Sequence, residues 1–186
     1  RTVRFVDGLN RLLQEKTDAA VLAEGANAPD DVMIVSGRVT FDHAGRITEQ
    51  YYPVSEPLGS SGVFNDAYDD VPPTEFAYDV MNRVTSETWP NGATTGWAFA
   101  FGPGRDGTVQ FETLKTDANG IQTREYRNVR QRITGIREAD RAEEEVIWTS
   151  CAYDPLNRPI AIEDDQNNMA EVSYDKLGRR TALTLP

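Results

Sequence analysis

Tyr78-Asp79-Val80-Met81-Asn82-Arg83 is the stretch that decides the fold, because near-copies of it recur along the chain. Two copies match it closely: Tyr153-Asp154-Pro155-Leu156-Asn157-Arg158 and Tyr174-Asp175-Lys176-Leu177-Gly178-Arg179. Three copies are looser: Val6-Asp7-Gly8-Leu9-Asn10-Arg11, Phe41-Asp42-His43-Ala44-Gly45-Arg46 and Arg127-Asn128-Val129-Arg130-Gln131-Arg132. One hexamer can therefore be followed six times in register, which is typical of a repeat protein.

The second and fifth positions of the hexamer have the chemistry of a tight turn. The second is Asp five times and Asn once, and a side-chain oxygen there accepts hydrogen bonds from backbone N–H groups two residues on. The fifth is Asn or Gly in five copies, the residues that best tolerate positive φ, and Gln131 is the exception. We therefore expect positive φ at the other five: Asn10, Gly45, Asn82, Asn157 and Gly178.

The first position is mostly aromatic and the sixth is Arg in all six copies, which turn geometry alone does not require. We expect the arginine to reach a neighbouring carboxylate or carbonyl as a strut with several donors; a solvated side chain is the alternative. With apolar residues after most arginines, the hexamer predicts strand, bulged turn, strand. The candidate site consists of these repeat-motif residues: Asp7, Asn10, Arg11, Asp42, Gly45, Arg46, Tyr78, Asp79, Asn82, Arg83, Asn128, Arg132, Tyr153, Asp154, Asn157, Arg158, Tyr174, Asp175, Gly178 and Arg179.

The segments between the hexamers predict an all-β fold of repeated antiparallel hairpins that form one long curved sheet. Pro90-Asn91-Gly92, between two alternating stretches, is the strongest hairpin signal. We expect one long strand from Val32 to Phe41. The wide spacing between Asp79 and Asn128 predicts a worn seventh copy at Phe101-Gly102-Pro103-Gly104-Arg105.

Other segments predict loops. Residues 24–31 are expected to form a loop, 53–73 an insertion loop and 137–145 a charged hairpin tip. Any helix should be confined to short pieces near 12–23 or 138–145. We expect a single repeat region over residues 1–186 that is a piece of a longer chain.

Composition excludes several classes of partner. The 186 residues carry a net charge of −11 and have a pI near 4.6, which argues against nucleic acid and anionic membrane surfaces. No apolar run is long enough for a membrane span. Cys151 is the one cysteine, which excludes an intramolecular disulfide, and it lies in an apolar stretch where we expect a half-buried strand thiol.

No motif predicts an enzyme, a metal site or a cofactor. His43 is the one histidine, so zinc sites with paired histidines and Ser-His catalysis are both excluded. Residues 163–168 offer oxygen ligands but lack the Gly and Glu of an EF-hand loop. Trp89, Trp97 and Trp148 would stack on sugars if they were exposed, although aromatic residues at strand spacing are more often core.

The hexamer Tyr-Asp-x-x-(Gly/Asn)-Arg, with Asn-Gly hairpins between copies, resembles the YD repeat of the Rhs family. That family includes the B and C components of bacterial insecticidal toxin complexes and the teneurins, and the resemblance runs from Val6 to Arg180. It implies a β-sheet wound into a hollow shell that encloses a C-terminal toxin in bacterial members, and a secreted or cell-surface location. Asp154-Pro155 also resembles an Asp-Pro motif of the family's self-cleaving region, but it fits the ordinary repeat as well.

Two classes of function remain. The first is a non-catalytic segment of a shell wall, with the other repeats of the parent chain and an enclosed polypeptide as partners. The second is an adhesive or carbohydrate-binding module on a cell surface. Because the last hexamer is a full copy, we also expect an uncapped strand edge that frays or self-associates through residues 177–185.

Overall fold

The computed structural model describes residues 1–22, 25, 28–66, 71–142 and 145–186. These described residues form sixteen β-strands and no helix, so the predicted all-β fold of antiparallel hairpins is confirmed. The strands belong to two antiparallel sheets, one of four strands and one of twelve. The chain divides into two compact units, residues 1–94 and residues 95–186.

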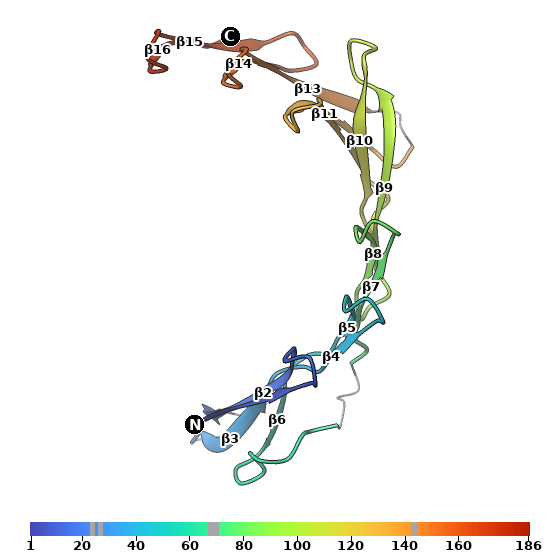
Figure 1. Cartoon of the computed structure of the whole chain (residues 1–186), viewed down its shortest axis with the longest axis vertical. Helices are drawn as coiled ribbons and strands as arrows, with labels where there is room; N and C mark the ends of the chain where they lie inside the picture. The colour runs from blue at the N-terminus through green and yellow to red at the C-terminus, as the bar shows by residue number, and fades with distance from the viewer. Residues whose placement is uncertain (23–24, 26–27, 67–70, 143–144) are drawn as a thin grey trace. The chain divides into compact units, whose positions relative to one another are not determined.

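The first unit holds two groups of strands (Figure 1). The four-stranded sheet has the order β1-β2-β3-β6, with bounds β1 Thr2–Val6, β2 Leu12–Val21, β3 Asp30–Val35 and β6 Val54–Pro57. The second group has the order β4-β5-β7-β8, with bounds β4 Val39–Phe41, β5 Ile47–Gln50, β7 Thr74–Tyr78 and β8 Val84–Thr88.

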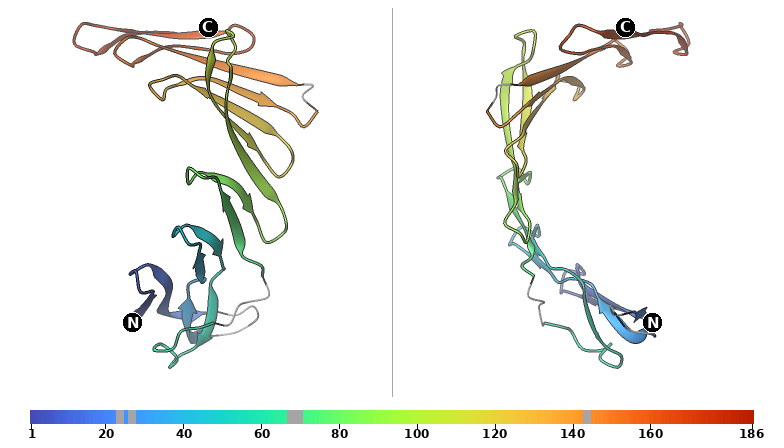
Figure 2. Two further views of the ribbon diagram at one scale, coloured as in Figure 1. Left: turned by 45° about the vertical axis from the view of Figure 1, so that its right-hand side comes forward. Right: turned by 180° about the vertical axis from the view of Figure 1, so that it is seen from behind.

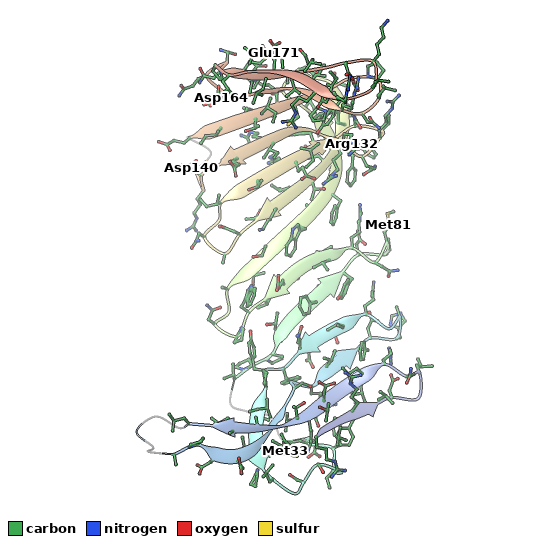
Figure 3. All side chains as sticks on the ribbon, turned by 90° about the vertical axis from the view of Figure 1, so that its left-hand side faces the viewer. Met33, Met81, Arg132, Asp140, Asp164 and Glu171 are labelled. Carbon is green, nitrogen blue, oxygen red and sulfur yellow. The ribbon has the colours of Figure 1, made fainter. Side chains whose placement is uncertain are left out.

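The second unit is a simple meander, in which each strand pairs with the next one in the sequence (Figure 2). Its strands are β9 Thr94–Pro103, β10 Val109–Thr116, β11 Gln122–Arg127, β12 Ile133–Ala139, β13 Val146–Tyr153, β14 Pro159–Glu163, β15 Met169–Tyr174 and β16 Arg180–Thr184. In this unit Arg132 lies at one end of the strands, and Asp140 and Asp164 lie at the other end (Figure 3).

Each hexamer begins with a β-bulge. The strand register shifts at the first hexamer position of all six copies, for example between Ala77 and Tyr78 and between Ser173 and Tyr174. A bulge increases the local twist and re-aims the side chain that carries it. The predicted order of strand, bulged turn and strand is therefore confirmed.

The buried core is small and partly polar. Met33, Val35, Tyr126 and Ala139 are its buried apolar residues in the described part of the chain. Most other strand residues are half-buried, and β15 alternates between exposed and half-buried positions, as a sheet with one covered face does. Stability here depends more on contacts between neighbouring strands than on a thick interior.

Three local predictions were wrong. The strand expected from Val32 to Phe41 is split, because β3 ends at Val35 and pairs with β6 whereas β4 pairs with β5. The 53–73 segment, expected as an insertion loop, contains strand β6. The worn copy is shifted, because the hydrogen bonds from Gly104 N to Thr108 O and from Gly107 N to Gly104 O place its turn at residues 103–108.

Three other expectations fall partly outside the described residues. Residues 12–21 are strand β2, while residue 23 of the alternative helix is not described. The expected loop at 24–31 is described only at residues 25 and 28–31, and β3 begins at Asp30. The charged tip predicted at 137–145 is shorter than expected, because β12 continues to Ala139; residues 143–144 of that tip and 67–70 of the insertion are not described.

Candidate functional site: the repeated turn

The second-position carboxylate organises each turn. Asp79 Oδ1 accepts hydrogen bonds from the N–H groups of Met81 (2.8 Å) and Arg83 (2.9 Å), and Asp79 Oδ2 accepts one from Arg83 Nε (2.7 Å). Two backbone bonds close the ring, from Asp79 N to Arg83 O (2.9 Å) and from Asn82 N to Asp79 O (3.1 Å). The same five bonds recur around Asp7, Asp42, Asp154 and Asp175.

The fifth position is left-handed in every copy. Asn10, Asn82 and Asn157 have φ of 61°, 64° and 65°, and Gly45 and Gly178 have φ of 79° and 82°, as the sequence predicts. Gln131 also has φ of 61°, although Gln is not a residue that favours this region. Asn128 Oδ1 accepts hydrogen bonds from the N–H groups of Arg130 and Arg132. The hydrogen bonds of the turn therefore hold Gln131 at positive φ.

The turn keeps its carboxylate ionised. In Asp79, the hydrogen bond from the backbone N–H of Arg83 is the largest cause that lowers the pKa; burial opposes it, and the Arg83 guanidinium adds to it. The pKa values of Asp7, Asp42 and Asp154 are lowered for the same reasons. A carboxylate held in this way is an acceptor for its own turn, because its protonated form would lose these bonds.

The sixth-position arginine connects one turn to the next. Arg46 binds Asp42 of its own turn through Nε, and its Nη1 donates to Asp79 O (3.0 Å) and Asn82 Oδ1 (3.1 Å) of the following hexamer. Its guanidinium also lies over the Tyr78 ring, with Cζ 4.8 Å from the ring centroid. The expected strut between neighbouring turns is therefore present at this arginine.

Two more arginines stack on the aromatic residue of the following hexamer. Arg11 lies over the Phe41 ring at 4.2 Å, and Arg158 lies over the Tyr174 ring at 4.5 Å. Such cation–π contacts are worth about 0.5–1 kcal/mol at partly exposed sites. The hexamers of Phe41 and Tyr174 both have Gly at the fifth position. A Cβ added at Gly45 would lie 3.2 Å from Arg11 Nη1, and one added at Gly178 would lie 3.4 Å from Arg158 Nη1.

The first-position tyrosine forms a hydrogen bond to the preceding repeat. Its hydroxyl donates to the carbonyl of the residue that directly follows the arginine of the preceding hexamer. The distances are 2.7 Å from Tyr78 to Ile47 O, 2.9 Å from Tyr153 to Ile133 O and 2.9 Å from Tyr174 to Pro159 O. Burial raises the pKa of Tyr78 and of Tyr153. Sequence reasoning anticipated the arginine strut but not this reciprocal hydrogen bond.

The insertion covers a buried polar cluster that the sequence did not indicate. The Lys16 side chain is 1% exposed and pairs with Glu56, which also accepts bonds from Ser60 Oγ (2.9 Å) and Asn65 Nδ2 (2.9 Å). Burial would raise the pKa of Glu56, but the hydrogen bonds from its three partners together lower it. Because Lys16 lies in a strand and the other three residues in the 53–73 segment, the cluster fixes that segment to the sheet.

A groove of about 430 Å³ lies on the second unit, between the 103–108 turn and strands β12 to β15. Arg105 spans it, donating to Asp164 O (2.9 Å) and Ser150 Oγ (3.3 Å). Cys151 lines the groove and is half-buried, as predicted, and burial raises the pKa of its thiol. A raised pKa disfavours the nucleophilic thiolate.

The described residues offer neither the ligand cluster of a metal site nor the helix of a membrane span. Within the described ranges, no cluster of three or more His, Cys, Asp and Glu side chains could hold a metal ion. The described residues also contain no helix that is long and apolar enough to cross a membrane. Trp89, directly after β8, and Phe101 on β9 are exposed, whereas Trp97 and Phe99 on β9 are half-buried.

Comparison with solved structures identifies the fold. The chain is similar to a TcdB2-TccC3 crystal structure (TM-score 0.58, 14% identity) and to the Photorhabdus luminescens Tc holotoxin pore carrying the TccC3-D651A mutation (TM-score 0.60, 14% identity). It is also similar to TcdB2-TccC3-Cdc42 (TM-score 0.57, 15% identity). Each match covers 99% of this chain and 11% of the other.

No protein-family model matches the sequence, and no curated protein matches it either. The structural matches nevertheless extend over both units, and they agree with the resemblance of the hexamers to YD repeats. The chain therefore shares its fold with part of these TcdB2-TccC3 toxin-complex structures.

Proposed function

We propose that this chain is a non-catalytic structural segment of an Rhs/toxin-complex-like protein, and that it forms part of a β-shell enclosing a C-terminal toxin or effector polypeptide. The repeat-motif residues would then hold neighbouring turns together. The parent protein would be secreted or displayed at the cell surface, as the resemblance implies. Its other repeats, and the enclosed polypeptide, would be the partners.

The contact between successive turns carries this proposal. In the first unit, Arg46 donates to two oxygen atoms of the next hexamer and stacks on Tyr78, while Tyr78 donates back to Ile47 O. These contacts engage the guanidinium of Arg46 and the ring and hydroxyl of Tyr78 in joining two turns. The arrangement supports a wall in which neighbouring turns are joined by similar contacts.

The geometry of Asp154 supports a non-catalytic role for this residue. Its carboxylate accepts bonds from Leu156 N, Arg158 N and Arg158 Nε, and these bonds lower its pKa. An aspartyl protease requires two carboxylates that share one proton in a shielded site, which raises the pKa of one of them. Asp154 is the ordinary second residue of a repeat turn.

The second candidate function is an adhesive or glycan-binding surface, and two exposed rings favour it. Trp89 is 45% exposed and Phe101 is 77% exposed. Phe101 borders a shallow groove of about 390 Å³ that includes Val109 and Val129. Exposed aromatic rings stack on sugar rings, so each of these side chains is by itself a candidate contact for a glycan.

Protease protection tests the primary proposal. The complete gene product that contains this segment is expressed, and the polypeptide that follows the segment is probed with a non-specific protease before and after mild denaturation. Enclosure predicts fragments that resist the protease until the shell is opened. Equal cleavage in both conditions would overturn the proposal.

Two further measurements separate the alternatives. Tryptophan fluorescence of the segment across a glycan panel should stay unchanged, and a saturable shift lost in Trp89→Ala would favour glycan binding. Purified protein should show no hydrolysis of esters, peptides, glycosides or nucleotides. Turnover that disappears in Asp154→Asn would contradict the non-enzymatic assignment.

A further inference from the structure

The sequence contains two Asn-Gly dipeptides, and each lies in a tight turn between two strands. The same backbone hydrogen bond closes both turns. Gly92 N donates to Trp89 O at 2.8 Å, and the φ of Gly92 is 79°. Gly120 N donates to Asp117 O at 3.0 Å, and the φ of Gly120 is 85°. Both asparagines are exposed, so a difference in their reactivity must come from the side chains around them.

The side chain of Asn91 is held by its own turn, whereas that of Asn119 is not. Asn91 Oδ1 accepts a hydrogen bond from Ala93 N at 2.9 Å. In the other turn Asp117 takes this part, because its Oδ1 accepts hydrogen bonds from Asn119 N (2.9 Å) and Ile121 N (2.8 Å). The Asn119 carboxamide accordingly makes no hydrogen bond to a described residue, and it is free to turn towards the glycine that follows it.

A cation lies against Gly120 but not against Gly92. A Cβ added at Gly120 would lie 3.0 Å from Arg141 Cγ, 3.1 Å from Arg141 Cδ and 3.5 Å from Arg141 Nε. At Gly92 no described atom beyond the chain neighbours lies within 4 Å of the same position. Arg141 therefore lies close to the Gly120 peptide group, where its charge stabilises negative charge that develops on that group.

We propose that Asn119 is a site of spontaneous deamidation, and that it reacts faster than Asn91 because its carboxamide is unrestrained and Arg141 lies beside Gly120. The deprotonated backbone nitrogen of Gly120 attacks Asn119 Cγ. The new N–Cγ bond closes a succinimide ring, the Cγ–Nδ2 bond breaks, and Nδ2 leaves as ammonia with the proton that the backbone nitrogen lost. The inference concerns the chemistry of one turn and is independent of what a shell would enclose.

Water then opens the succinimide ring. Addition of water at Cγ breaks the new N–Cγ bond and gives aspartate. Addition at the main-chain carbonyl carbon of residue 119 breaks the original peptide bond and gives isoaspartate, whose main chain runs through Cβ and Cγ. The overall change consumes one water molecule and releases one ammonia, and it needs no oxidant or reductant.

The modification changes the charge and the geometry of the turn. Either product places a carboxylate near the Arg141 guanidinium, which favours an ion pair between them. Isoaspartate also adds a main-chain methylene between Asp117 and Ile121, whose hydrogen bond from N to O closes the turn at 3.0 Å. The pairing of Thr116 with Gln122, at the end of β10 and β11, should therefore loosen in the isoaspartate form.

Peptide mapping by mass spectrometry tests the proposal on the full chain. The protein is incubated at mildly alkaline pH and digested, and fragmentation distinguishes aspartate from isoaspartate at each site. Asn119 should convert about fivefold faster than Asn91 or more, because a side-chain hydrogen bond restrains only Asn91. Synthetic peptides of residues 86–96 and 114–124, which have no fixed turn, should convert at similar rates. Equal or faster conversion of Asn91 in the chain, or the same difference in the free peptides, would overturn the proposal.

Variants of the chain test the role of the cation. Arg141→Gln should slow the conversion of Asn119 about two- to fivefold, the equivalent of one exposed charge interaction, and leave Asn91 unchanged. Lys176→Gln removes a positive charge from a different turn and should leave both rates unchanged. The proposal is overturned if Arg141→Gln does not slow Asn119, or if the two variants slow it equally.

Discussion

Arg158→Met should destabilise the last hairpin more than Arg179→Met does. Both arginines bind the aspartate of their own turn through Nε, at 2.6 Å and 2.7 Å. Only Arg158 is seen over the ring of a following hexamer, with Cζ 4.5 Å from the Tyr174 centroid, and its side chain is 27% exposed against 75% for Arg179. Methionine keeps the length of the side chain and removes the guanidinium.

The two substitutions remove a similar ion pair to the aspartate of the same turn. Their difference therefore isolates the stack on Tyr174, about 0.5–1 kcal/mol. Native-state amide exchange of β15 measures it, because opening of the last hairpin exposes those amides. We expect Arg158→Met to speed their exchange about two- to fivefold more than Arg179→Met does. Equal acceleration in the two variants would refute the claim that the arginine couples neighbouring turns.

Three other predictions concern the turn itself. Gln131→Gly should stabilise the protein by about 1 kcal/mol in urea unfolding, because Gly tolerates φ near 61°. Asn82→Val should destabilise it by about 1–2 kcal/mol, and Asn82→Gly should have little effect. The reverse order of stabilities would contradict the turn geometry. Tyr153→Phe should cost about 1 kcal/mol, because it leaves Ile133 O without its donor, and an unchanged unfolding midpoint would show that the bond contributes nothing. Stability should fall with acid: the folded pKa of Asp79 lies below its ordinary value of 3.8, so its contribution is complete above about pH 4 and is lost as pH falls through the folded pKa. Asp79→Asn should flatten that decline, and an identical pH profile for the variant would argue against it.

Much of the local structure could be predicted from the sequence, because the residues of the hexamer specify its turn locally. An aspartate that accepts two N–H bonds, and a residue that tolerates positive φ, specify the same turn wherever they occur. Five of the six left-handed positions followed from Asn and Gly alone. The strands around them followed from alternation between two fixed turns.

The errors arose where long-range pairing overrides local pattern. The 32–41 stretch is mostly apolar and β-branched, but Ser36-Gly37-Arg38 interrupts it at the division between β3 and β4. The division also depends on β6, whose residues pair with β3 from 19 to 25 residues further on. The predicted position of the worn copy is wrong because Arg105 resembles the motif arginine, whereas it is the third residue of the 103–108 turn and reaches across a groove to Asp164. The tyrosine bond to the preceding repeat was missed, since its acceptor is a carbonyl and leaves no mark in the sequence.

The most direct test of the central claim is a cryo-electron microscopy map of the complete gene product that contains this segment. A structural role predicts that the segment is built into a continuous wall, with density for an enclosed polypeptide on one side of it. A segment that stands apart as a free module, with both faces in solvent, would contradict it.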